Sequence, residues 1–178
     1  LKNAFNYTHA DNFDDAAYFT SSELDGNHAW KLYSDGFFMS PIDKTYAYPI
    51  REITKIGLSN FNYSLDTYKV GDVITFDDGS KGVIACAERD HTWVVALDDS
   101  SESYQLYTEN STNLQEIAYE TTSWKAMAPV FEPSDGYSCS RLLLENDKSP
   151  AVASIDTENG WYLPTANQLN KIFAEKSY

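Results

Sequence analysis

The clearest hydrophobic pattern in the chain is a set of three apolar, β-branched segments in its middle, at residues 72–76, 81–87 and 92–97. Polar turns separate them, and the first turn, at 77–80, contains an Asp-Gly pair. β-Branched residues favour strands, and Asp-Gly between two such runs favours a tight turn. The pattern therefore predicts a three-stranded antiparallel meander.

Shorter runs predict further strands in the first third of the chain. Residues 18–23 are expected to form a strand end, and 29–33 and 37–39 to form a hairpin. Residues 46–53 alternate between apolar and polar side chains and predict another strand, in which Pro49 indicates an edge or a bulge.

Turn and linker signals separate these strands. Tight turns are expected at 24–27, where Gly26 would supply a positive φ angle, and at 34–36. Residues 54–67 are polar and lack a clear period, so they are expected to form a linker. Residues 98–122 are predicted to be a loop for the same reason.

Two helices are predicted in the last third of the chain. The first spans 135–146 and has Asp135 as its N-cap. The residues expected to pack from it are Leu142, Leu143 and Leu144. The second begins at Thr165, whose hydroxyl can cap it. Its apolar face is expected to contain Leu169, Ile172 and Phe173, at helical spacing.

The apolar face of this last helix nearly continues into the start of the chain when the two ends are written tail to head. Leu1 and Phe5 then extend it. We therefore expect residues 1–53 to pack on residues 66–178 in one composite core. Tyr178 should lie near Leu1 of the same or a neighbouring subunit.

Composition narrows the class of protein. The chain has 178 residues, of which 42% are hydrophobic, so one globular domain is expected. Its formal net charge of -14 repels DNA, RNA and anionic membranes, so we expect no nucleic-acid partner. No apolar run approaches the roughly 20 residues of a membrane span.

Candidate reaction chemistry is sparse. The sequence contains no Gly-x-Ser-x-Gly elbow, P-loop or dinucleotide fingerprint, and we expect no enzyme activity. Cys86 and Cys139 lack metal-site spacing; Cys86 is predicted to be a buried thiol, and a disulfide between the two stays open. We expect no cofactor, with calcium as the alternative, because Asp77-Asp78 and Asp98-Asp99 read as turns and not as a converging set of oxygens.

Residues 158–169 contain Gly-Trp-Tyr-Leu-Pro at 160–164. They closely resemble the signature of C-type-lectin-like domains of the DUF1566 and Fibrobacter-paralogous type, which occur in Bacteroidetes surface proteins and phages. Ser-Ser-Glu at 21–23 and Ala-Trp at 29–30 resemble the closing segment of the same family. In that family the Trp before Ser-Ser-Glu is usual, whereas this chain has Phe19.

The resemblance covers nearly the whole chain, but in the wrong order. Residues 1–53 match the closing third of the family and 66–178 its opening part. The implied fold class is α+β, C-type-lectin-like, with short antiparallel strands, two helices and a permuted order. A circular permutation, one unit cut out of register from an array, or exchange of half-domains between subunits would each explain the order.

The resemblance also implies roles for particular residues. Packing roles are expected for Trp30, Arg51, Gly160, Trp161, Leu163 and Pro164. The ligand face is expected on the loops at 24–48, at Asp25, Asn27, His28, Asp35, Phe37, Phe38 and Tyr46. Alternation leaves open that one of the two phenylalanines faces the core instead.

Together these features predict an extracellular, cell-surface or virion-surface module for binding or adhesion, whose partner is a glycan or a surface protein. The alternative is a structural subunit that joins copies of itself into a fibre, shell or array by exchanging half-domains.

Overall fold

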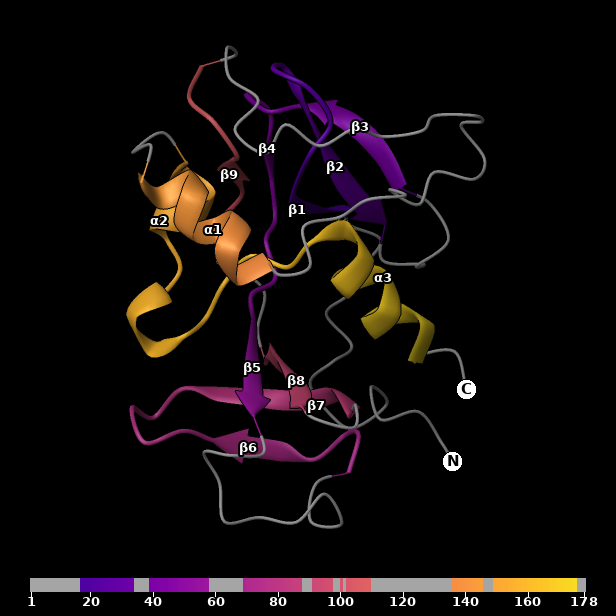
Figure 1. Ribbon diagram of the computed structural model, residues 1–178, viewed down its shortest axis with the longest axis vertical. Coiled ribbons are helices and arrows are strands. Elements are labelled where there is room, and N and C mark those ends of the chain that lie inside the picture. The colour runs from indigo at the N-terminus through magenta and orange to yellow at the C-terminus, as the bar shows by residue number, and fades with distance from the viewer. Residues whose placement is uncertain are drawn as a thin grey trace.

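The structure is a computed structural model, and it describes residues 17–33, 39–57, 69–87, 91–97, 100, 102–109, 136–145 and 149–175. Within these ranges, antiparallel strands form three sheets, and three α-helices accompany them. The fold class is therefore mixed α+β, with one more helix than the sequence predicts. Figure 1 shows the largest sheet at the lower end of the molecule and a three-stranded sheet at the upper end, with helix α3 (Ala166–Glu175) between them.

The three-stranded sheet has the order β1 (Ala17–Glu23), β2 (His28–Tyr33) and β3 (Met39–Asp43). Both strand pairs are antiparallel, and the strands predicted at 18–23 and 29–33 are confirmed. The return strand was predicted at 37–39, but β3 overlaps that range only at Met39 and continues to Asp43. The expected start of the return strand, and the tight turn before it, lie outside the described residues. The inner strand β2 is buried from Ala29 to Leu32, and these residues are apolar apart from Lys31.

The four-stranded sheet contains the predicted meander. It consists of β6 (Val73–Thr75), β7 (Lys81–Ala87) and β8 (His91–Ala96), in consecutive antiparallel pairs. The turn between β6 and β7 places Gly79 at a φ of 87°, in the region where glycine is favoured. The meander and its Asp-Gly turn are therefore confirmed.

The fourth strand of this sheet corrects the linker prediction for 54–67. Residues 54–57 belong to β5 (Ile53–Gly57), which pairs with β8 at the edge of the sheet. Ile53 and Ile56 are buried, and the Thr54 hydroxyl donates to the carbonyl of Gly160 at 2.9 Å. The polar side chains here thus have partners far along the chain, which local periodicity does not reveal. Residues 58–67 lie outside the described part.

The prediction of a single strand at 46–53 is also wrong, because residues 49–52 lie in no strand and connect two strands of different sheets. Only β4 (Ala47–Tyr48) is a strand before β5, and it pairs with β9 (Tyr104–Gln105). Pro49 follows β4, and its carbonyl accepts the amide of Phe19 at 3.1 Å. The strand β9 lies in the stretch that the sequence predicts to be loop.

The helices begin near their expected positions. Helix α3 is capped by Thr165, whose Oγ1 accepts the Gln168 amide at 3.2 Å, as predicted. Helix α1 (Gly136–Glu145) matches the predicted span, but its expected N-cap Asp135 lies outside the described residues. A short helix, α2 (Pro150–Ala153), was not expected; Ser149 caps it.

The packing predicted for the three leucines of α1 is only partly right. Leu143 is fully buried, Leu142 is intermediate and Leu144 is exposed. Consecutive residues are about 100° apart around a helix, so three in a row cannot all face one core.

Among the described residues, the buried side chains form two core clusters, and both contain residues from before position 57 and from after position 82. One includes Phe19, Ile84, Leu143 and Trp161; the other includes Tyr18, Ile53, Leu169 and Ile172. The amide of Ala166 donates to Ser22 Oγ at 3.0 Å, which adds a polar link between the same two parts of the chain. Phe173, Leu1, Phe5 and Tyr178, which the sequence places on the same face as Leu169, lie outside the residues whose side chains are described.

The residues expected to pack are buried, apart from the turn residue Gly160. Trp30, Arg51, Trp161, Leu163 and Pro164 have little or no exposed surface. Gly160 has a φ of 84° and ends a short 3-10 helix, Thr157–Asn159. Cys86 is a buried thiol, as predicted, and Cys139 is one as well, so the disulfide that the sequence left open is not formed.

Candidate functional site

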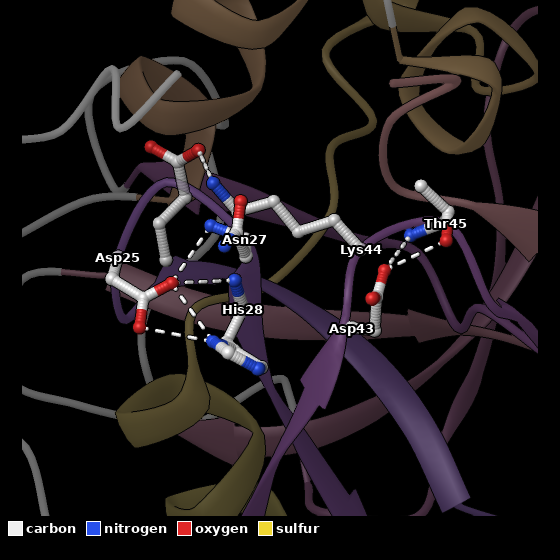
Figure 2. Close-up of polar contacts among 7 residues, drawn as sticks. Asp25, Asn27, His28, Asp43, Lys44 and Thr45 are labelled. Atoms are coloured by element: carbon white, nitrogen blue, oxygen red, sulfur yellow. Dashed lines mark hydrogen bonds and ion pairs between the residues drawn. The ribbon is translucent and has the colours of Figure 1, made fainter. Parts of the chain in front are cut away.

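Two tight turns lie side by side, and Figure 2 shows Asp25, Asn27 and His28 on the first. With Tyr46, which belongs to the second, they are four of the seven predicted ligand residues. In the first turn, the amides of Leu24 and Asp25 both donate to the carbonyl of His28. In the second, the Tyr46 amide donates to the carbonyl of Asp43 at 3.1 Å. The two turns, 24–28 and 43–46, are joined because the Lys44 amide donates to the Asn27 carbonyl at 2.9 Å. We call them the turn pair.

The first turn is closed by the side chain of Asp25. Its Oδ1 accepts the amides of Asn27 at 2.7 Å and His28 at 2.8 Å, and both carboxylate oxygens lie 2.9 Å from His28 Nδ1. Burial raises the pKa of Asp25, but the hydrogen bonds from His28 and Asn27 outweigh it, so the net pKa is lowered. The expected positive φ at Gly26 is wrong, because these carboxylate bonds shape the turn instead.

The second turn is closed in the same way. Asp43 Oδ1 accepts the Thr45 amide at 2.9 Å and the Thr45 hydroxyl at 2.7 Å (Figure 2). Both aspartates are therefore engaged within their own turns. The exposed candidates that remain are Asn27 and Tyr46, and the Tyr46 side chain is 58% exposed.

A buried ion pair holds the turn pair to the core. Lys44 Nζ lies 2.6 Å from Glu23 Oε1, and both side chains are fully buried. The ammonium also lies 4.8 Å from the centre of the Tyr107 ring, and the Tyr107 amide donates to the Lys44 carbonyl. Burial, and then the negative charge of Glu23, raise the pKa of the Tyr107 hydroxyl. Lys44 thus fixes the second turn through its backbone and its side chain.

The other predicted ligand residues, Asp35, Phe37 and Phe38, lie outside the described part of the chain. Their described neighbours are at the opposite end of the β2–β3 pair. Leu32 faces Met39 there, whereas His28 faces Asp43 at the turn pair. Four residues of strand separate the two ends by about 13 Å. The described structure therefore brings together Asp25, Asn27, His28 and Tyr46 only.

A separate cavity, which the sequence did not indicate, lies beside the four-stranded sheet. Its volume is about 500 Å³, within the range of small-ligand pockets. It shares no residue with the turn pair. Its lining comprises Ile50, Glu52, Gly79, Ser80, Lys81, Ala96, Leu97, Ser100, Tyr104, Ser154 and Trp161. These residues come from five segments of the chain, so no local motif marks the cavity.

Hydrogen bonds within the protein fix the serines of the lining. Ser80 Oγ accepts from Trp161 Nε1 at 3.3 Å and donates to Asp78. Ser100 Oγ accepts the Ile50 amide and donates to a backbone carbonyl. Ser154 Oγ also donates to a backbone carbonyl at 2.8 Å. The wall of the cavity is therefore largely preformed.

Glu52 differs from these serines. Within the described part of the chain its carboxyl makes no hydrogen bond or ion pair, although only an intermediate fraction of the residue is exposed. Burial raises its pKa, the nearby charge of Asp156 raises it further, and Arg51 lowers it. Arg51 itself donates to the carbonyl of Leu97 at 2.8 Å. Sequence reasoning treated Glu52 as an ordinary strand position and missed it.

No protein-family model, curated protein or solved structure matches this chain. Across the ranges that the structure describes, no three His, Cys, Asp or Glu side chains gather as a metal site would require. Over the same ranges, none of the helices has the length and apolar character needed to cross a bilayer.

Proposed function

We propose that this chain is a non-enzymatic, extracellular binding or adhesion module that recognises a glycan or a surface protein through the turn pair. The observation that carries the proposal is the display of Asn27 and exposed Tyr46 on two joined turns that a buried Glu23–Lys44 ion pair anchors. Exposed binding residues on loops held by a rigid scaffold are a common way to build a recognition surface.

The chemistry of these side chains suits polar, ring-containing ligands and protein loops. A tyrosine ring offers a flat apolar face together with a hydroxyl. The asparagine amide can donate and accept hydrogen bonds at the same time. Because the turns are already closed by Asp25 and Asp43, little conformational entropy remains to be lost on binding.

The resemblance of residues 158–169 to C-type-lectin-like domains supports the same proposal, together with a permuted order of the family's segments. The buried Trp161 and Leu163, and the positive φ of Gly160, are compatible with the packing that the resemblance implies. Fold resemblance alone does not fix a ligand, so the side chains of the turn pair carry the functional argument.

The test is binding of the whole chain to a glycan array and to a panel of bacterial surface proteins, followed by variants. Asn27→Ala and Tyr46→Ala should each weaken binding about tenfold, while the melting temperature stays within a few degrees, because both residues are exposed. Tyr137→Ala is the matched control, since Tyr137 is an exposed tyrosine on helix α1, outside the turn pair. Unchanged affinity in both turn variants would contradict the proposal.

The structural alternative, assembly by exchange of half-domains, predicts a concentration-dependent mass. Within this one chain, residues before position 57 and after position 82 already share both core clusters, so a second copy is not needed to complete them. Mass photometry and size-exclusion chromatography at several concentrations separate the two functions. A monomer at every concentration would exclude the assembly role.

A further inference from the structure

We propose that the cavity beside Glu52 is a second binding site, and that it takes a protonated primary amine carried on a small ligand, with the Glu52 carboxylate as its counter-charge. Amino sugars and lysine side chains share this chemistry. The site is independent of the turn pair because the two have no residue in common.

One polar group of the cavity wall lacks a hydrogen-bond partner within the described part of the protein. The three serines of the lining have their hydroxyl donors bonded within the protein. The Glu52 carboxyl has no such bond within the described ranges, although it is largely removed from water. A partly buried carboxylate without a hydrogen-bond partner is unfavourable. A ligand that donates a hydrogen bond to it therefore gains more binding free energy than it would from a solvated carboxylate.

The charges around Glu52 favour a cationic ligand. Asp156 and Arg51 are the charged groups that act on its carboxyl. Asp156 repels the ionised form, and Arg51 is engaged with the Leu97 carbonyl. Lys81 also lines the cavity, but it is exposed and is not among the groups that shift the pKa of Glu52. Within the described part of the chain no cation forms an ion pair with the Glu52 carboxyl, so a ligand cation can take that place, and the net charge of -14 attracts cations.

The cavity also has an aromatic wall. Tyr104 and Trp161 both line the cavity, and the Trp161 ring is held edge-on by Phe76 at 5.4 Å between ring centres. An ammonium is attracted to the face of an aromatic ring, and a hydrocarbon or sugar skeleton packs against it. The volume of about 500 Å³ accommodates one such small ligand.

The amine should also bind more tightly as pH rises through the pKa of Glu52. Burial and Asp156 raise that pKa, so the carboxyl keeps its proton to higher pH than an exposed glutamic acid does. The amine needs the ionised form, and binding at acid pH therefore requires loss of the proton.

The experiment is a titration of the ¹⁵N-labelled chain, followed at the Trp161 indole N–H, whose bond to Ser80 sits in the cavity wall. The probes are D-glucosamine and Nα-acetyl-lysine amide; the neutral controls are D-glucose and Nα-acetyl-norleucine amide. We expect the Trp161 signal to shift with at least one amine, and about tenfold weaker binding of its neutral control. Response to one amine and not the other would distinguish a sugar from a peptide source.

Glu52→Gln should weaken amine binding about tenfold and remove its pH dependence. Glu145→Gln makes the same charge change at an exposed carboxylate outside the cavity lining, and should leave affinity within about twofold. If a folded Glu52→Gln chain keeps full affinity, or if neither amine shifts the Trp161 signal at tens of millimolar, the proposal is wrong. Neither result bears on the turn pair, which is tested through Asn27 and Tyr46.

Discussion

Replacing Lys44 with methionine tests whether the buried ion pair anchors the turn pair. The change keeps a long apolar side chain but leaves the Glu23 carboxylate without its ammonium in a fully buried position. The two charges are 2.6 Å apart, so their attraction is about 6 kcal/mol at an effective dielectric constant of about 20. In the intact pair, the cost of desolvating both charges offsets much of this attraction. In Lys44→Met the desolvation cost of the Glu23 carboxylate remains, without the attraction of the ammonium to offset it.

We therefore expect Lys44→Met to lower the free energy of unfolding by about 3–5 kcal/mol. The double variant Glu23→Met/Lys44→Met removes both charges and should recover most of that loss, to within about 1–2 kcal/mol of the parent chain. Urea unfolding followed by tryptophan fluorescence measures all four corners of the cycle. A loss below about 1 kcal/mol in Lys44→Met, or strictly additive single variants, would refute the reasoning.

Three further outcomes are expected. Glu52→Gln should raise the free energy of unfolding at pH 7, because the pKa of Glu52 is raised in the folded state. The stability that this raised pKa contributes is complete below the unfolded pKa of about 4.3 and is lost as pH rises through the folded pKa. The gain in the free energy of unfolding should therefore vanish in urea melts at pH 3.5. Gly82→Ala should cost about 1–3 kcal/mol in the same melts, because the new Cβ would lie 2.4 Å from Val94 Cγ1 and 2.7 Å from the Val95 carbonyl; a change under 0.5 kcal/mol would show that β8 yields easily. Thr165→Ala should cost about 1 kcal/mol through loss of the α3 cap, whereas Thr165→Ser should be nearly neutral, and equal losses would mean that the hydroxyl is not the cause.

The elements that sequence reasoning found are those whose stabilising contacts are local. The meander is marked by β-branched runs around an Asp-Gly turn, and helix α3 by a threonine that caps it. The strand β5 was missed because its stability comes from distant partners. It pairs with β8, some 40 residues further on, and its Thr54 hydroxyl reaches Gly160. A polar stretch with such partners looks the same in the sequence as a linker.

The two candidate sites differ in the same way: the turn pair has local signals in the sequence, and the cavity has none. The turn pair was partly predictable, because Asp and Asn next to Gly mark turns and turns are exposed. The sequence could not show that the carboxylates of Asp25 and Asp43 accept hydrogen bonds within those turns and so close them. The cavity could not be anticipated, since Glu52, Lys81, Tyr104 and Trp161 are brought together only by the folded sheet and its neighbours.

The two sites also gain their rigidity in different ways, and this decides how each should respond to mutation. The turn pair is anchored to the core by the buried Lys44–Glu23 ion pair, so damage there should weaken binding without any change in the exposed residues. The cavity wall depends on several modest hydrogen bonds, such as Trp161 to Ser80 and Ser100 to Ile50. Losing any one of these costs only about 1 kcal/mol. Binding at the cavity should therefore tolerate single changes in its wall, and should fail mainly when Glu52 loses its charge.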